Sequence, residues 1–252
     1  RITKKTKAIV AVDYGGIPCD YEKLKNICKK YNLNLISDAA QSLGTLYKGK
    51  PSAEYSDFTA YSFQAIKTIT TSDGGMLVVN SENLSKKAER IRWFGIDRQE
   101  KQKGTWENDI YEVGYKYQMT DLSACLGLTS LDEIEELIAH RRKIFSIYKN
   151  FIKNRKVKVI AIDESDGSKI VPWLCTIIVN SGREILMKTL RDKGIESAQV
   201  HYRNDRYTVF GNRRKDLPNM DKIENKYLVL PLHHKVSEDN ARYICNIINS
   251  NW

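Results

Sequence analysis

The chain is 252 residues long, with 41% hydrophobic residues, 29% charged residues and only 5 prolines, which excludes collagen-like and Pro/Gly-rich disordered chains. This length is sufficient for one or two domains with a buried core. The formal net charge is +10, but the basic residues are scattered among acids, so the charge is weak evidence for a nucleic-acid partner.

The first half of the sequence alternates short apolar runs with helical periodicity. Residues 8–12 form a continuous apolar run, typical of a strand covered on both faces. Asp20 is a suitable N-cap, and apolar residues recur after it at helical spacing as far as Tyr31. Further strands are predicted at 33–37, 58–63 and 76–79, the last two separated by a polar loop at 70–75. This order predicts right-handed crossovers and a mostly parallel sheet.

The second half has a different pattern, which begins with one long helical stretch from Asp121 to about Phe151. After it we expect a strand at 173–179, a helix at 183–193 ended by Gly194, a strand at 195–200 and a last helix that starts at Ser237. These elements predict a small α+β domain. We expect a large α/β domain at 1–135 and the small domain at 136–252.

The cysteines and the absence of long apolar runs bear on the compartment. The five cysteines include no CxxC pair, and Cys28, Cys125 and Cys245 fall at apolar positions of predicted helices. We therefore expect buried, reduced thiols in a cytoplasmic protein. The four histidines have no metal-ligand spacing, so no metal site is predicted. No apolar run reaches the roughly 18 residues of a membrane span, and no signal peptide is recognised.

Two charged residues follow neighbouring predicted strands. Asp38 stands at the end of one strand, where parallel sheets bind ligands, and Lys67 follows the next strand. Pyridoxal phosphate chemistry requires such a pair, because the lysine forms a Schiff base with the aldehyde and the carboxylate keeps the pyridine nitrogen protonated. On the pair alone, a turn aspartate and a solvated surface lysine are the favoured interpretation.

Longer segments around these residues favour the first interpretation. They are residues 12–16 with 36–44, residues 62–67 with 70–76, residues 114–124 with Gly127, and residues 230–233. In order and rough spacing, these segments resemble the DegT/DnrJ/EryC1/StrS family of sugar aminotransferases. The resemblance implies fold type I, the fold of pyridoxal-phosphate-dependent transferases.

The resemblance also implies a role for individual residues. Asp38 matches the acid that holds the pyridine nitrogen, Gln41 the side chain near the ring hydroxyl, and Ala40 the small residue packed under the ring. Ser62 matches the phosphate-binding hydroxyl. Lys67 matches the Schiff-base lysine, which also moves the proton between substrate and cofactor.

Two further sites follow from the same resemblance. The loop 114–119 would cross to a neighbouring subunit and approach its cofactor phosphate, with Lys116 where asparagine is common, so a homodimer is implied. His201 and Tyr202 lie where relatives contact the sugar nucleotide, although a polar surface loop is an equally good interpretation.

The resemblance implies an enzyme that transfers an amino group from glutamate or glutamine to a nucleotide-linked keto sugar, in polysaccharide biosynthesis. Lys67, in place of the histidine of related dehydratases, favours amination. Neither nucleic acid nor a membrane is expected as a partner. Family members have a considerable N-terminal stretch before the Asp38 region, so we expect the large domain to be incomplete. The alternative is a truncated, non-catalytic remnant or subunit of the same fold.

Overall fold

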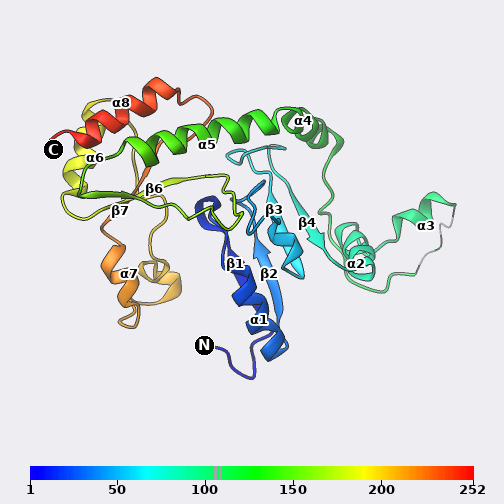
Figure 1. Ribbon diagram of the computed structural model, residues 1–252. Helices are drawn as coiled ribbons and strands as arrows, with labels where there is room; N and C mark the ends of the chain where they lie inside the picture. Colours follow the sequence, from blue (N-terminus) through cyan, green and yellow to red (C-terminus); the bar gives the residue numbers. More distant parts are fainter. Residues whose placement is uncertain (105–106, 108) are drawn as a thin grey trace. The chain divides into compact units, whose positions relative to one another are not determined.

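The computed structural model describes residues 1–104, 107 and 109–252, and the chain divides into two compact units (Figure 1). The first unit comprises residues 1–14, 18–135 and 165–170, and the second comprises residues 15–17, 136–164 and 171–252. The main division lies at the start of the long helix α5. Two short segments are exceptions to this division: residues 15–17 belong to the second unit, and residues 165–170 belong to the first.

The first unit contains a four-stranded sheet in the order β1-β2-β3-β4. Strands β1, β2 and β3 run parallel to one another, and β4 is antiparallel to β3. This confirms the predicted mostly parallel sheet. The strands span Ala8–Val12 (β1), Asn34–Asp38 (β2), Phe58–Ser62 (β3) and Gly75–Val79 (β4).

A helix that packs on β1 and β2 contributes to the core of the first unit. Helix α1 (Tyr21–Tyr31) begins at Asp20, whose carboxylate accepts from the backbone N–H of Lys23, so the predicted N-cap is confirmed. Side chains of α1 pack against the alternate residues Ala11 and Leu35 of β1 and β2. On the opposite face, Val10 is 59% exposed and Val12 is 47% exposed. The expectation that this strand is covered on both faces is therefore wrong for this chain.

The remaining helices of the first unit follow the sheet in sequence. The helical stretch predicted from Asp121 to about Phe151 is confirmed as two helices that cross from one unit to the next. The first ends where the N–H of Glu133 donates to the carbonyl of Leu131. The helices span Glu82–Arg92 (α2), Arg98–Gln102 (α3), Asp121–Asp132 (α4) and Ile134–Phe151 (α5), the last of which continues into the second unit.

The second unit contains a three-stranded antiparallel sheet with helices, which agrees with the predicted α+β class. The expected strand at 195–200 is wrong, because only Ala198 pairs there, in a single bridge to Val229 of β7. Strand β7, which the sequence did not predict, pairs with β6 on one side and forms the bridge to Ala198 on the other. The elements are β5 (Val157–Val159), β6 (Cys175–Val179), α6 (Arg183–Asp192), α7 (Pro218–Ile223), β7 (Tyr227–Leu230) and α8 (Glu238–Asn249).

Of the three cysteines expected to be buried in helices, two are buried and one is exposed. All five thiols are free, and Cys28, Cys175 and Cys245 are buried. Cys125 is exposed, which contradicts the expectation, because α4 presents much of its apolar surface to solvent. Over residues 1–104, 107 and 109–252, no helix is long and apolar enough to cross a membrane, and no metal-binding cluster of His, Cys, Asp or Glu is present.

The N-terminus of α8 allows a stability test of the second unit. Ser237 Oγ accepts from the N–H of Asn240, and Asn240 Oδ1 accepts from the N–H of Ser237, which forms a capping box. We expect Ser237→Ala to lower the free energy of unfolding by about 1 kcal/mol, measured by chemical denaturation. Ser237→Asp keeps the acceptor and should retain the stability, and an unchanged Ser237→Ala protein would contradict the assignment.

Candidate active site at one edge of the parallel sheet

The parallel pairing of β2 and β3 brings two predicted site residues to the same edge of the sheet. Asp38 is the last residue of β2 and pairs with Ala60 of β3. Ser62 ends β3, and Gly75 of the antiparallel β4 lies opposite it. Because the carboxyl ends of β2 and β3 lie together, the segments after Asp38 and Ser62 leave the sheet at one place.

The turn after β2 holds the Asp38 carboxylate. Asp38 Oδ1 accepts from the N–H of Ala40 at 3.1 Å, and the N–H of Ala39 continues the sheet ladder to Ala60 O at 2.9 Å. The side chain of Ala39 is 1% exposed, whereas Asp38, Ala40 and Gln41 are half-buried. The turn is thus anchored on its inner side, and its three predicted cofactor-binding residues remain accessible.

The loop that carries Lys67 closes on itself after β3. The N–H of Phe63 donates to Gly74 O, and Phe63 O accepts from the N–H of Thr71, both at 2.9 Å. Phe63 and Ile69 are buried and hold the two ends of the loop in the core. The N–H of Lys67 donates to Gln64 O at 2.9 Å, so Lys67 stands in a tight turn and its side chain is half-buried.

Lys67 and Asp38 interact electrostatically. Partial burial lowers the pKa of the Lys67 amine, and the negative charge of Asp38 opposes this shift in part. Burial is the larger effect, so the amine loses its proton more readily than an exposed lysine does. A neutral amine is the form that attacks an aldehyde and the form that accepts a proton.

Helix α4 supports the Lys67 loop from outside the sheet. Gly127 lies so close to this loop that an added Cβ would be 2.9 Å from Thr71 Cγ2. Ser130 Oγ donates to the carbonyl of Thr70 at 3.3 Å. Sequence reasoning did not find this support, although a glycine on an apolar helix is a signal for close packing.

Among the residues that the structure describes, the contacts of the predicted residue Lys116 are with Trp93 and Gln118, and not with the Lys67 turn. Its ammonium is 4.6 Å from the centre of the Trp93 ring, and its Nζ donates to Gln118 Oε1 at 3.5 Å. The loop is fixed by a backbone contact, because a Cβ on Gly114 would lie 1.9 Å from Gly95 N. Lys116 itself is exposed.

The predicted substrate residues His201 and Tyr202 belong to the second unit, and both are exposed. The guanidinium of Arg206 stacks 4.3 Å above the Tyr202 ring, and the Tyr227 hydroxyl donates to the carbonyl of His201. The structure describes each unit by itself, so the role of these two residues remains a prediction.

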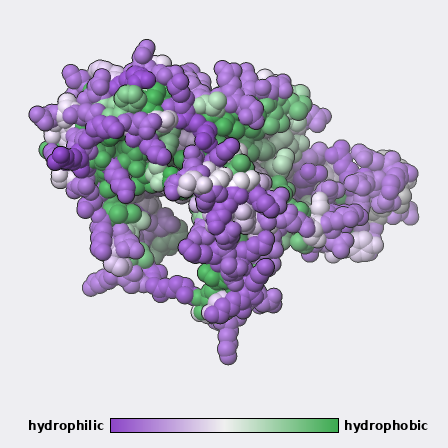
Figure 2. Space-filling model, viewed as in Figure 1, coloured by the Kyte–Doolittle hydropathy of each residue, from purple (hydrophilic) through white to green (hydrophobic). Residues whose placement is uncertain are grey.

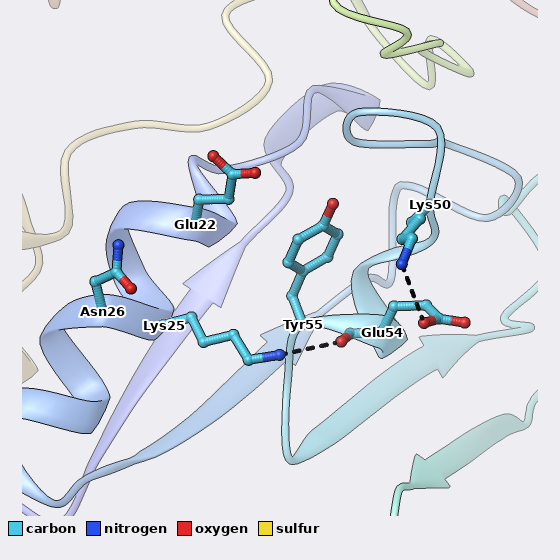
Figure 3. A pocket seen from close by; sticks show the side chains of 6 residues that line it. All are labelled: Glu22, Lys25, Asn26, Lys50, Glu54 and Tyr55. Atoms are coloured by element: carbon cyan, nitrogen blue, oxygen red, sulfur yellow. Dashed lines mark hydrogen bonds and ion pairs between the residues drawn. The ribbon is translucent and has the colours of Figure 1, made fainter.

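A pocket of 320 Å³ lies elsewhere in the first unit, between α1 and the short turn Ser52–Glu54 (Figure 3). Its lining holds two lysines and two glutamates: Lys50 lies 4.0 Å from the Glu54 carboxylate, and Lys25 Nζ donates to the backbone carbonyl of Glu54. Because its charges are compensated, it is a weaker candidate for cofactor chemistry than the sheet edge. Its lining residues are Glu22, Lys25, Asn26, Lys50, Glu54 and Tyr55.

The side chains at this edge of the sheet fit pyridoxal phosphate. The edge offers the Asp38 carboxylate for a protonated ring nitrogen and the Lys67 amine, with a lowered pKa, for an aldehyde. Ser62 supplies a half-buried hydroxyl for the phosphate, and Ala40 and Gln41 flank the carboxylate. Each of these side chains is partly accessible, as a ligand at this edge requires.

Comparison with known proteins places this chain in one family. The sequence profile of the DegT/DnrJ/EryC1/StrS aminotransferase family matches residues 1–249. The chain therefore belongs to this family, and the predicted family and fold class are confirmed.

Three similar proteins illustrate the relationship. GDP-perosamine synthase from Escherichia coli O157:H7 is 33% identical, over 99% of this chain and 66% of its own length. UDP-4-amino-4,6-dideoxy-N-acetyl-beta-L-altrosamine transaminase from Campylobacter jejuni is 32% identical, over 94% of this chain and 63% of its own. The PMP-form of Spr1654 from Streptococcus pneumoniae has a TM-score of 0.84 at 30% identity, over 98% of this chain and 70% of that one. This chain thus spans about two thirds of the length of its relatives.

The electrostatic coupling of the two charged residues can be tested. We expect Asp38→Asn to lower the pKa of Lys67 further, because it removes a negative charge that raises this pKa. The measurement is pH-dependent labelling of individual lysines, read by mass spectrometry.

The matched control for this test is Glu22→Gln. The hydrogen bond from Lys48 to Glu22 raises the pKa of Lys48, so this variant should lower the labelling midpoint of Lys48 and leave that of Lys67 unchanged. A Lys67 midpoint that stays constant or rises in Asp38→Asn would contradict the coupling.

Proposed function

We propose that this chain carries the cofactor-binding and catalytic residues of a pyridoxal-phosphate-dependent aminotransferase. Its substrate is a keto sugar linked to a nucleotide diphosphate, and its amino donor is glutamate or glutamine. Family membership supports the reaction class. The observation that carries the proposal is the convergence of Asp38 and Lys67 on one edge of the sheet, within range of electrostatic interaction.

The proposed division of labour follows from the chemistry of each side chain. Pyridoxal phosphate, when bound, would supply an aldehyde carbon that can take up an amino group with loss of water, and a ring that withdraws electrons. Asp38 accepts a hydrogen bond from the ring N–H and keeps the proton there. Lys67 would hold the aldehyde carbon in the resting enzyme and, once the amine of the donor has replaced it there, would remove and return a proton during the transfer. Ser62 donates to the phosphate, and Ala40 and Gln41 orient the ring.

The substrate and donor are inferred from the relatives. The names of two similar proteins describe a GDP-linked and a UDP-linked sugar, so they support a nucleotide-linked sugar and leave the base open. We propose His201 and Tyr202 as contacts for the sugar nucleotide, because their exposed rings can stack on and hydrogen-bond to such a ligand. We place the enzyme in polysaccharide biosynthesis in the cytoplasm.

A covalent trapping experiment tests the assignment of Lys67. The folded chain is mixed with pyridoxal phosphate, reduced with borohydride and digested, and the peptides are analysed by mass. We expect a phosphopyridoxyl group on Lys67, because its amine is the lysine amine whose pKa burial lowers at this edge. Lys67→Ala should abolish the adduct.

Lys25→Ala, in the pocket of Figure 3, is the control variant and should still form the adduct on Lys67. A folded chain that gives no Lys67 adduct would favour the alternative, a non-catalytic form of the same fold.

The exposed surface of α4 supports a homodimer. Helices that are apolar on most sides are typically buried, yet α4 presents apolar side chains around most of its circumference, and Figure 2 shows apolar side chains gathered over its position. A second copy of the chain is the occupant that the family resemblance favours. The exposed side chains are Leu122 (77%), Leu126 (46%), Leu128 (63%) and Leu131 (48%).

A charged substitution on α4 tests this dimer. Leu126→Lys should shift the chain from dimer to monomer in sedimentation equilibrium, because burying an unpaired ammonium in an apolar interface costs several kcal/mol. Ile185→Lys changes a solitary exposed apolar residue of α6, 57% exposed, and should leave the association constant unchanged. Equal effects of the two variants would refute the α4 interface.

A further inference from the structure

A buried carboxylate lies directly behind the candidate active site. Asp13 follows the last residue of β1, and its side chain is 1% exposed. Its N–H donates to the carbonyl of Asp38 at 3.1 Å, so the backbones of Asp13 and Asp38 are joined at the edge of the sheet where Lys67 lies. The proposed catalytic steps do not use this carboxylate.

Three donors converge on the Asp13 carboxylate. Oδ1 accepts from the N–H of Cys19 at 2.9 Å and from the hydroxyl of Tyr21 at 2.7 Å. Oδ2 accepts from the hydroxyl of Ser42 at 2.9 Å. Both oxygens are therefore engaged, and removing the carboxylate would leave buried donors without partners.

Two of these donors, Tyr21 and Ser42, connect Asp13 to the turn that carries Asp38. Ser42 ends the turn, is 4% exposed and donates its N–H to Ala39 O at 3.1 Å. The Tyr21 hydroxyl also lies 2.7 Å from Ser37 Oγ, on the residue before Asp38. The contacts of Asp13 thus reach both ends of the turn, and the accessible residues Asp38 and Gln41 lie between them.

Burial in this position has an electrostatic cost. Burial raises the pKa of Asp13, while the bonds from Cys19, Tyr21 and Ser42 favour the ionised form and lower it in part. A carboxylate that is kept despite this cost needs a role that an apolar residue could not fill, and a fixed set of three hydrogen bonds is such a role.

We propose that Asp13 is a positioning residue that holds the turn 38–42 from behind and so fixes the Asp38 carboxylate and Gln41 toward the cofactor. Asp13 itself does not touch the cofactor. The effect of Asp13 on cofactor binding rests on the proposed function. The hydrogen bonds by which Asp13 stabilises the turn do not.

The test uses the full chain and two measurements. Hydrogen exchange of the segment 38–45, followed by mass spectrometry without cofactor, reports how strongly the turn is stabilised. Spectral titration with pyridoxal phosphate reports the affinity for the cofactor. Asp13→Ala and Ser42→Ala should each exchange faster in this segment, roughly tenfold for Asp13→Ala, and Asp13→Ala should weaken cofactor binding roughly tenfold.

Two control variants separate positioning from general destabilisation. Asp13→Asn keeps an acceptor for Cys19 and Tyr21, and its amide can donate to the Ser42 hydroxyl, so exchange and affinity should stay close to those of the parent. Tyr148→Phe removes a buried hydrogen bond, 2.9 Å long, to Pro231 O in the second unit and should leave both readouts unchanged. If Asp13→Ala does not fold, Ser42→Ala and Asp13→Asn still decide the question.

Unchanged exchange in segment 38–45 for Asp13→Ala and Ser42→Ala would overturn the proposal. Faster exchange with undiminished cofactor affinity would overturn the link between the turn and the cofactor. If the parent chain binds no pyridoxal phosphate, the proposed function fails, and faster exchange in the variants still supports the grip of Asp13 on the turn.

Discussion

The parallel pairing of β2 with β3 is the constraint on which the candidate site depends. Asp38 ends β2 and Lys67 lies in the loop after β3, and the shared direction of the two strands brings the connections that follow them to one edge. In an antiparallel pair the two connections would leave the sheet at opposite ends. The crossover through the Ser52–Glu54 turn therefore determines the site as much as the charged residues themselves.

Burial shifts the pKa values of the two charged groups around the turn in opposite directions. The Lys67 amine is half-buried, so its pKa falls even though Asp38 is near. Asp13 is almost fully buried, so its pKa rises even though three donors contact it. In both cases the loss of hydration outweighs the nearby favourable interactions. The result is a more reactive amine in front of the turn and a firmly hydrogen-bonded carboxylate behind it.

The sequence predicted those features that depend on local patterns. The apolar run 8–12, the N-cap Asp20 and the helix start at Ser237 need only a few adjacent residues, and all three are confirmed. Features that depend on distant contacts were wrong or missing. The expected strand at 195–200 was wrong because this segment makes only a single bridge, from Ala198 to Val229 of β7. The bond from Ser42 to Asp13 spans 29 positions, so no periodicity reports it.

Helix α4 links the proposed dimer interface to the proposed active site. Its inner side holds the Lys67 loop, through Gly127 against Thr71 and through Ser130 on Thr70, while its leucines face outward. A second copy that covers these leucines would restrict the motion of α4 and thereby of the loop that carries Lys67. By thermodynamic linkage, a ligand that orders this loop must in turn favour association to the same extent. In this fold, self-association and cofactor binding are thus expected to share one structural element, and their free energies should not be separable.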